Sequence, residues 1–180
     1  MLRKYFVAAV LVVLFAEPIF AQELNSVWGK WQYLLGEWQG AGSGQPGDGN
    51  GSFTLKPKLG GNILERKSKT EFAATATAPA LIHEDVMIVY KNSDGTPGKA
   101  IYFDNEGHAI QYTITYTDNK IILTSDANPT MPRFRLSYEM LEKNLVNIRF
   151  EMAMPNAPEQ FKMYLEGKSK KVKELSEMPK

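Results

Sequence analysis

Residues 108–125 read HAIQYTITYTDNKIILTS, and the pattern of this stretch is that of a β protein. Ile110, Tyr112 and Ile114 alternate with polar residues, so an extended strand here has one apolar and one polar face. Asp118-Asn119 then supplies turn chemistry before a second apolar run that ends at Ser125. The stretch therefore predicts two antiparallel strands joined by a tight turn.

The same period of two recurs along most of the chain, with Gly, Asn and Asp between the alternating runs. Short connections of this kind join neighbouring antiparallel strands into a meander. A meander of many strands hides its two edges best by closing on itself. We therefore expect an all-β fold, a single antiparallel up-and-down barrel of roughly ten strands, at residues 36–44, 50–58, 62–72, 81–91, 98–104, 108–117, 120–125, 133–141, 144–153 and 160–168.

The other segments frame this barrel. Trp28, Trp31 and Leu35 recur at helical spacing, which predicts a short N-terminal helix over Glu23–Leu35. Residues 22–168 then form the barrel domain, and the Lys-rich residues 169–180 are expected to be a flexible basic tail. Residues 73–79 and 126–132 form longer connections, of the kind that rims the mouth of a barrel.

The N-terminus has the pattern of a signal peptide over residues 1–21. Arg3 and Lys4 precede an apolar run from Phe6 to Phe15, and Ala21 offers a small residue at the cleavage point. The run is much shorter than the ~20 residues that a membrane-spanning helix needs. We therefore expect an exported protein, periplasmic or secreted, with no stable membrane insertion after cleavage.

Composition excludes several classes of function. The chain has 21 Lys and Arg against 20 Asp and Glu, so it lacks the basic excess of a typical nucleic-acid-binding protein, and we expect no nucleic-acid partner. It contains no Cys, which removes disulfides, thiolate metal sites and thiol nucleophiles. The two His lie 25 residues apart without recognisable ligand spacing, so we expect no metal site.

Residues 34–42 read LLGEWQGAG, a Gly-x-Trp motif followed by glycines at alternate positions. This run resembles the start of calycin-superfamily barrels: the lipocalins, the fatty-acid-binding proteins and the nitrobindin-like haem proteins. Among these, the chain is most similar to the exported bacterial barrels. The resemblance implies a small ligand inside the barrel. It also implies, for the nitrobindin-like branch, a haem-ligating His on the last strand, where this chain has Lys162 and Met163. We therefore expect no cofactor, because the route to haem is not matched.

The leading hypothesis is a binding protein that holds a small hydrophobic or amphipathic molecule inside the barrel, and is not an enzyme. Large aromatic rings would bury the apolar body, and a few polar groups would fix the head. On strand 81–91 both faces are apolar, so the pattern leaves open whether His83 and Asp85 or Glu84 point inward. The candidate ligand-binding residues are Trp38, Arg66, His83, Tyr102, His108 and Tyr112.

Two alternatives remain open at this point. Asp104 with His108, or His83 with Asp85, can form an acid–base pair for an enzyme acting on a small substrate, with Ser125 the nearest hydroxyl nucleophile in the chain. The other alternative is a structural envelope protein whose barrel is filled by its own side chains. A cavity smaller than about 300 Å³ would favour that reading. The pattern leaves the oligomeric state open.

Overall fold

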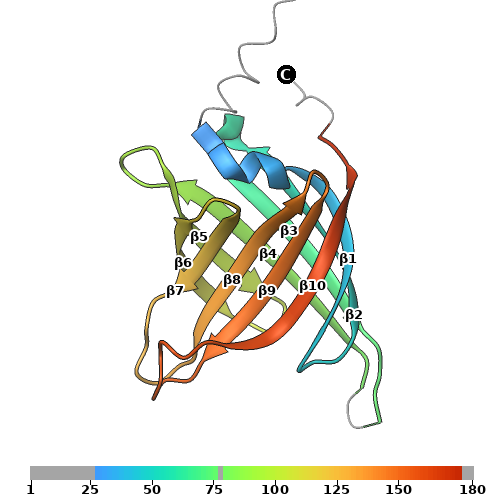
Figure 1. The fold of residues 1–180 in the computed structure, drawn as a ribbon. Coiled ribbons are helices and arrows are strands. Elements are labelled where there is room, and N and C mark those ends of the chain that lie inside the picture. Colours follow the sequence, from blue (N-terminus) through green and yellow to red (C-terminus); the bar gives the residue numbers. More distant parts are fainter. Residues whose placement is uncertain (1–26, 77–78, 176–180) are drawn as a thin grey trace, which may run out of the picture.

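A computed structural model describes residues 27–76 and 79–175, and the signal-peptide segment lies outside them. The described chain is an all-β fold of ten antiparallel strands, drawn in Figure 1. Their bounds are β1 Gly36–Gly44, β2 Gly49–Lys58, β3 Ile63–Phe72, β4 Leu81–Lys91, β5 Pro97–Asp104, β6 Ala109–Tyr116, β7 Lys120–Ser125, β8 Arg133–Glu142, β9 Leu145–Ala153 and β10 Lys162–Lys173.

Each strand pairs with its neighbours in the sequence, and β1 pairs with β10 to close the barrel. The expected up-and-down barrel is therefore confirmed. Closure leaves no unpaired strand edge, which removes the main aggregation hazard of an exposed sheet. One boundary differs: β10 continues to Lys173, so residues 169–173 belong to the barrel and not to a flexible tail. These residues are ordered because they pair with the start of β1; Trp38, for example, pairs with Lys171.

Part of the expected N-terminal helix over Glu23–Leu35, residues 23–26, lies outside the described residues. In the described part, Val27 and Trp28 are α-helical and are followed by a short 3₁₀ segment, η1, Gly29–Leu34, before β1. A second 3₁₀ segment, η2, Leu59–Gly61, lies between β2 and β3. The described residues therefore show a 3₁₀ turn and not the whole predicted helix, and the rings of Trp28 and Trp31 are held by hydrogen bonds to Gly61 and Tyr116.

Three tryptophans close one end of the barrel, where η1 lies across the opening in Figure 1. Trp28, Trp31 and Trp38 are all almost fully buried. Each indole N–H donates a hydrogen bond: Trp28 to Gly61 O at 2.9 Å, Trp31 to Tyr116 Oη at 2.9 Å and Trp38 to Leu34 O at 2.8 Å. Large rings with satisfied donors thus make a rigid plug.

Glycines allow β1 and β10 to approach closely where the barrel closes. Gly42 pairs with Gly167 across the seam. A Cβ on Gly42 would lie 2.6 Å from Glu166 O, and one on Gly167 would lie 2.6 Å from Ala41 O. Glycine at these positions therefore permits a backbone approach that a side chain would prevent.

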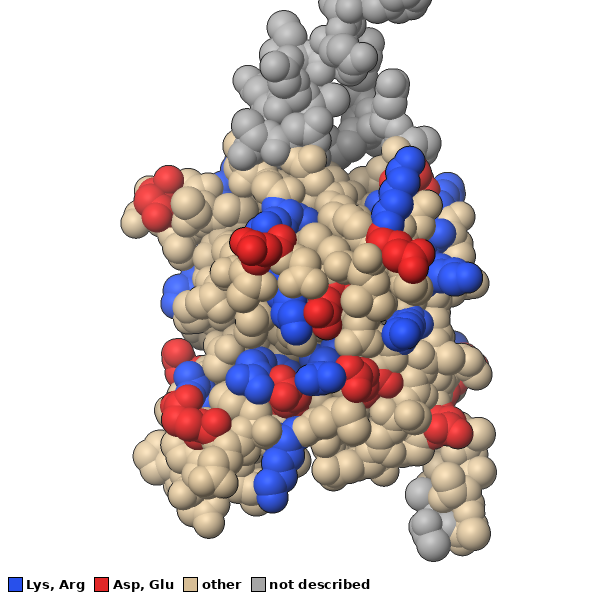
Figure 2. Space-filling view, viewed as in Figure 1, with Lys and Arg blue, Asp and Glu red and all other residues tan. Residues whose placement is uncertain are grey.

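The outer surface is charged, with positive and negative side chains interspersed, as Figure 2 shows for the face of β8–β10. Arg135 forms a paired contact with Glu151, and Arg149 forms one with Glu166, both outside the barrel. In residues 27–76 and 79–175, no helix combines the length and the apolar character needed to cross a membrane.

Candidate ligand-binding cavity

A cavity of about 540 Å³ occupies the part of the barrel away from the tryptophan plug. Its mouth lies at the end of the barrel near residues 73–76 and 126–132, because the exposed Leu81 and Met131 line it there, as do Glu106 and His108. The volume exceeds the ~300 Å³ that is the lower bound for small-molecule sites. A barrel filled by its own side chains is therefore not what the structure shows.

The deep polar wall is built by β3 and β4. Arg66 and Asp85 form a buried ion pair, with 2.8 Å between Arg66 Nη1 and Asp85 Oδ1. Burial lowers the pKa of the Arg66 guanidinium, but Asp85 and the neighbouring Tyr138, Tyr102 and Tyr112 together outweigh burial, so the pKa is raised. The inward face of β4 is thus the one with His83 and Asp85, while Glu84 is exposed.

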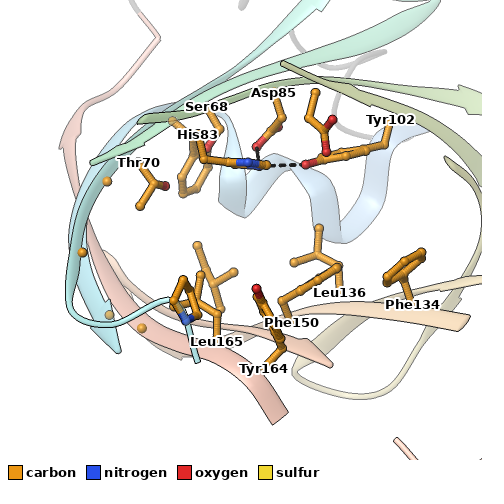
Figure 3. A pocket seen from close by; sticks show the side chains of 18 of the residues that line it. Ser68, Thr70, His83, Asp85, Tyr102, Phe134, Leu136, Phe150, Tyr164 and Leu165 are labelled. Carbon is orange, nitrogen blue, oxygen red and sulfur yellow. Dashed lines mark hydrogen bonds and ion pairs between the residues drawn. The ribbon is translucent and has the colours of Figure 1, made fainter. Parts of the chain in front are cut away.

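His83 links this pair to the mouth of the cavity. Its Nε2 lies 2.9 Å from Tyr102 Oη and 3.7 Å from Asp85 Oδ2, and its Nδ1 lies 2.9 Å from Glu106 Oε1. Figure 3 shows the contacts to Tyr102 and Asp85 along one side of the cavity. A chain of hydrogen-bonding groups therefore runs from the depth of the barrel to its rim.

Asp104 and His108 meet across the β5–β6 turn, with 2.8 Å between Asp104 Oδ2 and His108 Nδ1. The other oxygen of Asp104 accepts hydrogen bonds from the backbone N–H groups of Glu106 and His108. Burial opposes the charge of Asp104, but these hydrogen bonds outweigh it and hold the pKa of the carboxyl below its ordinary value. The carboxylate therefore organises the turn as well as orienting the imidazole.

The opposite wall is apolar and comes from β8, β9 and β10. Phe134 and Phe150 are stacked, with ring centroids 5.7 Å apart, and Tyr164 meets Phe150 edge-on at 6.1 Å. Figure 3 places these rings, with Leu136 and Leu165, across an open space from the polar wall. The cavity is therefore amphipathic, with one hydrogen-bonding side and one aromatic side.

A bulge in β10 sets part of that apolar wall. The pairing of β10 with β9 shifts between Met163 and Leu165, and both Tyr164 and Leu165 line the cavity. Met163 is 48% exposed whereas Leu165 lines the cavity, so these two residues do not share a face as a regular strand would place them. The extra residue of a bulge reverses the side-chain phase beyond it.

Two tyrosines of the cavity, the buried Tyr112 and the half-buried Tyr102, remain neutral hydrogen-bonding groups. Burial, together with the charge of Asp85, raises the pKa of Tyr102 far above its ordinary value. Burial also raises the pKa of Tyr112, whose ring meets Tyr102 edge-on at 6.4 Å. Both phenols can therefore donate or accept a hydrogen bond in the cavity without adding charge.

Of the candidate residues, the structure brings five to the cavity lining: Arg66, His83, Tyr102, His108 and Tyr112. Trp38 is not among the lining residues, because it stacks on Phe53 in the plug at the closed end. Sequence reasoning missed Glu106 and the aromatic wall. The alternation of Phe134 and Phe150 was a usable signal for that wall, whereas no pattern could pair a turn Glu with His83.

The structure contains one of the contacts that the enzyme alternative requires, but it does not bring the candidate nucleophile to the cavity. The Asp104–His108 contact forms as the acid–base reading requires. Ser125, however, is buried, does not line the cavity, and accepts a hydrogen bond from Phe134 N at 2.9 Å. The described residues contain no group of three or more His, Asp or Glu placed to hold a metal ion.

The residues of β10 do not fit haem by the route that the calycin resemblance implies. Lys162 and Met163, where the resemblance would place the ligating His, are both exposed. The neighbouring Tyr164 faces the cavity in their place.

Compared with family models and with curated proteins, the chain matches none. Among solved structures, it is similar to a redesigned β-barrel, mFAP1, bound to DFHBI, at 11% identity and a TM-score of 0.39, with 78% of this chain and 96% of that chain covered. A protein of unknown function of the DUF3598 family from Nostoc punctiforme is 9% identical with a TM-score of 0.28, covering 80% of this chain and 99% of that one. Likeness at this level carries no argument, so the fold assignment rests on the strand pairing.

Proposed function

We propose that this protein binds a small amphipathic molecule inside its barrel and is not a catalyst. The observation that carries the proposal is the 540 Å³ cavity with a polar wall on one side and an aromatic wall on the other. Ligand pockets are typically concave and mostly apolar, with a few convergent polar groups that fix orientation. The ligand's apolar body would pack on Phe134 and Phe150, and its polar head would meet His83 and Tyr102.

We also propose that the protein is a calycin-like barrel and that it is exported from the cytoplasm. Two features support the calycin-like class: the Gly-x-Trp motif at Gly36 and Trp38, and the closed ten-strand meander. The pattern of Arg3, Lys4 and the apolar run that follows supports export to the periplasm or beyond. A carrier or scavenger of a poorly soluble molecule is consistent with such a location.

A fluorescent probe tests whether the cavity is a binding site. N-phenyl-1-naphthylamine is apolar, uncharged and brightens when it leaves water. We expect it to bind the wild-type protein, and we expect Thr70→Trp, which adds a large ring to the cavity lining, to weaken binding at least tenfold. Lys69→Trp adds the same ring to the outer face of β3 and is the matched control. Equal binding by the two variants would place the probe outside the barrel and contradict the proposal.

Native mass spectrometry identifies the natural ligand. The protein would be purified gently from the envelope fraction of its own host and measured under non-denaturing conditions. A discrete adduct that disappears on denaturation would support a carried ligand, and its mass would give the chemical class. An adduct that persists on denaturation would be a covalent modification and would count against reversible carriage.

A further inference from the structure

The charges that line the cavity are unbalanced toward the negative. Asp85, Asp104 and Glu106 contribute three carboxylates, whereas Arg66 is the single Lys or Arg among the described lining residues. We propose that the cavity selects its ligand by charge: it accepts amphipathic molecules with a cationic or uncharged head, such as an organic amine, and rejects carboxylates. This inference rests on the proposed function, because it names the ligand class of the same site.

Arg66 is not available to an anionic ligand. Its guanidinium is already paired with Asp85 at 2.8 Å, and the Arg66 and Asp85 side chains are only 10% and 5% exposed. A ligand carboxylate that took Arg66 would leave Asp85 as a buried charge without a partner, which is strongly unfavourable.

The other two carboxylates have imidazoles as partners and no fixed cation. Asp104 contacts His108, and Glu106 contacts His83, each within 2.9 Å. Neither of these two carboxylates has a Lys or Arg partner among the described residues. Glu106 also stands at the rim with a side chain that is 45% exposed, so an entering head group meets a negative potential first.

The aromatic wall reinforces this preference. The faces of Phe134, Phe150 and Tyr164 carry the negative side of the ring quadrupole, which attracts cations and repels anions. None of the residues of that wall that line the cavity is basic, so a carboxylate head would find no compensating charge there. Both walls therefore favour the same sign of ligand.

Three probes with one naphthyl body separate charge from shape. 2-(1-Naphthyl)ethylamine is cationic, 2-(1-naphthyl)ethanol is neutral, and 1-naphthaleneacetate is anionic. We expect the amine to displace N-phenyl-1-naphthylamine at a concentration at least tenfold lower than the acetate, with the alcohol between them. Acetate binding as tight as amine binding would overturn the charge selection and leave the proposed function intact. If neither the fluorescent probe nor any competitor binds, the proposed function itself fails.

Two variants assign the selectivity to named residues. Glu106→Gln removes the charge at the rim of the cavity. We expect it to lower the ratio of amine affinity to acetate affinity about fivefold. Asp85→Asn leaves Arg66 without its counter-charge, and we expect it to improve acetate binding over wild type. Glu84→Gln, on the outer face of β4, is the matched control and should leave the ratio unchanged. An identical ratio in the Glu106 and Glu84 variants, or unimproved acetate binding by folded Asp85→Asn, would contradict the assignment.

Discussion

Arg66 and Asp85 face each other inside the barrel, with Nη1 and Oδ1 2.8 Å apart on adjacent strands β3 and β4. The guanidinium also lies over the ring of Phe53, 5.4 Å from its centroid, and near that of Tyr138 at 6.0 Å. The pair thus stands at the boundary between the aromatic plug region and the ligand cavity. Because Asp85 balances its charge, Arg66 can be buried between the aromatic plug region and the cavity.

Substituting either Arg66 or Asp85 should lower the free energy of unfolding strongly. Substituting both should lower it by less than the sum of the two single losses. We expect Arg66→Met and Asp85→Leu to lower the free energy of unfolding by about 3–5 kcal/mol each, because each leaves an uncompensated buried charge. The double variant should recover much of that loss. Urea denaturation followed by Trp fluorescence measures all three. Strict additivity of the two losses would contradict a direct interaction.

Tyr138 provides a test of an unpaired buried group. Its hydroxyl is buried without a hydrogen-bond partner among the described residues, and burial raises its pKa to about 12. We expect Tyr138→Phe to stabilise the protein by about 1 kcal/mol, since it removes an unsatisfied polar atom. Tyr33→Phe is the contrasting control, because Tyr33 Oη donates to Leu145 O at 2.6 Å and its loss should destabilise. A large destabilisation by Tyr138→Phe would mean that its hydroxyl has a partner.

Acid should weaken the β5–β6 turn through Asp104. The folded pKa of this carboxyl lies below its ordinary value of 3.8, so its ionised form stabilises the fold fully above that value. The contribution is lost as pH falls through the folded pKa. We therefore expect the difference in Tm between wild type and Asp104→Asn to shrink between about pH 5 and pH 2. Asp126→Asn, in an exposed loop, is the control, and a matching trend there would assign the effect to net charge.

Substitutions in the tryptophan plug should affect stability, whereas substitutions in the cavity lining should affect probe binding. Trp38→Ala is expected to lower stability by about 3–5 kcal/mol, because it removes a fully buried ring. Probe affinity at a temperature where the variant is folded should stay near that of wild type, since Trp38 does not line the cavity. Phe150→Ala should instead weaken the binding of N-phenyl-1-naphthylamine. Fluorescence titration beside thermal unfolding distinguishes the two, and an affinity loss in Trp38→Ala larger than in Phe150→Ala would reverse the assignment.

Closure of the barrel should depend on the glycine seam. Gly42→Ala would place a methyl group 2.6 Å from Glu166 O, so we expect a loss of about 1–3 kcal/mol or more from overpacking. Gly51→Ala is the matched control, because its nearest neighbour is the Thr70 hydroxyl at 3.0 Å, on a side chain that can rotate. Equal stability of the two variants would show that the seam can spread.

The order and near-complete extent of the ten strands followed from local pattern. Alternation such as that of Ile110, Tyr112 and Ile114 needs only a half-buried strand, and turns such as Asp118-Asn119 need only local backbone geometry. The connections were short enough to leave an antiparallel meander as the natural topology. Three of the candidate residues, Arg66, Tyr102 and Tyr112, lie in the lining of the cavity, and their role there stays a prediction.

Other features depended on contacts between distant residues. The inward face of β4 follows from Asp85 meeting Arg66, since both faces of that strand are apolar. Tyr164 reaches the cavity through a bulge whose position is set by pairing with β9. Trp38 packs in the plug and not in the site because its ring stacks on Phe53 of the next strand.

Local pattern therefore specified that this chain forms a closed meander barrel, because strand period and turn chemistry are properties of neighbouring residues. Packing across the barrel specified which side chains meet inside it, as with Glu106 and His83. Such contacts depend on register, bulges and ring packing between residues far apart in the chain, and the period of a single strand carries no information about them.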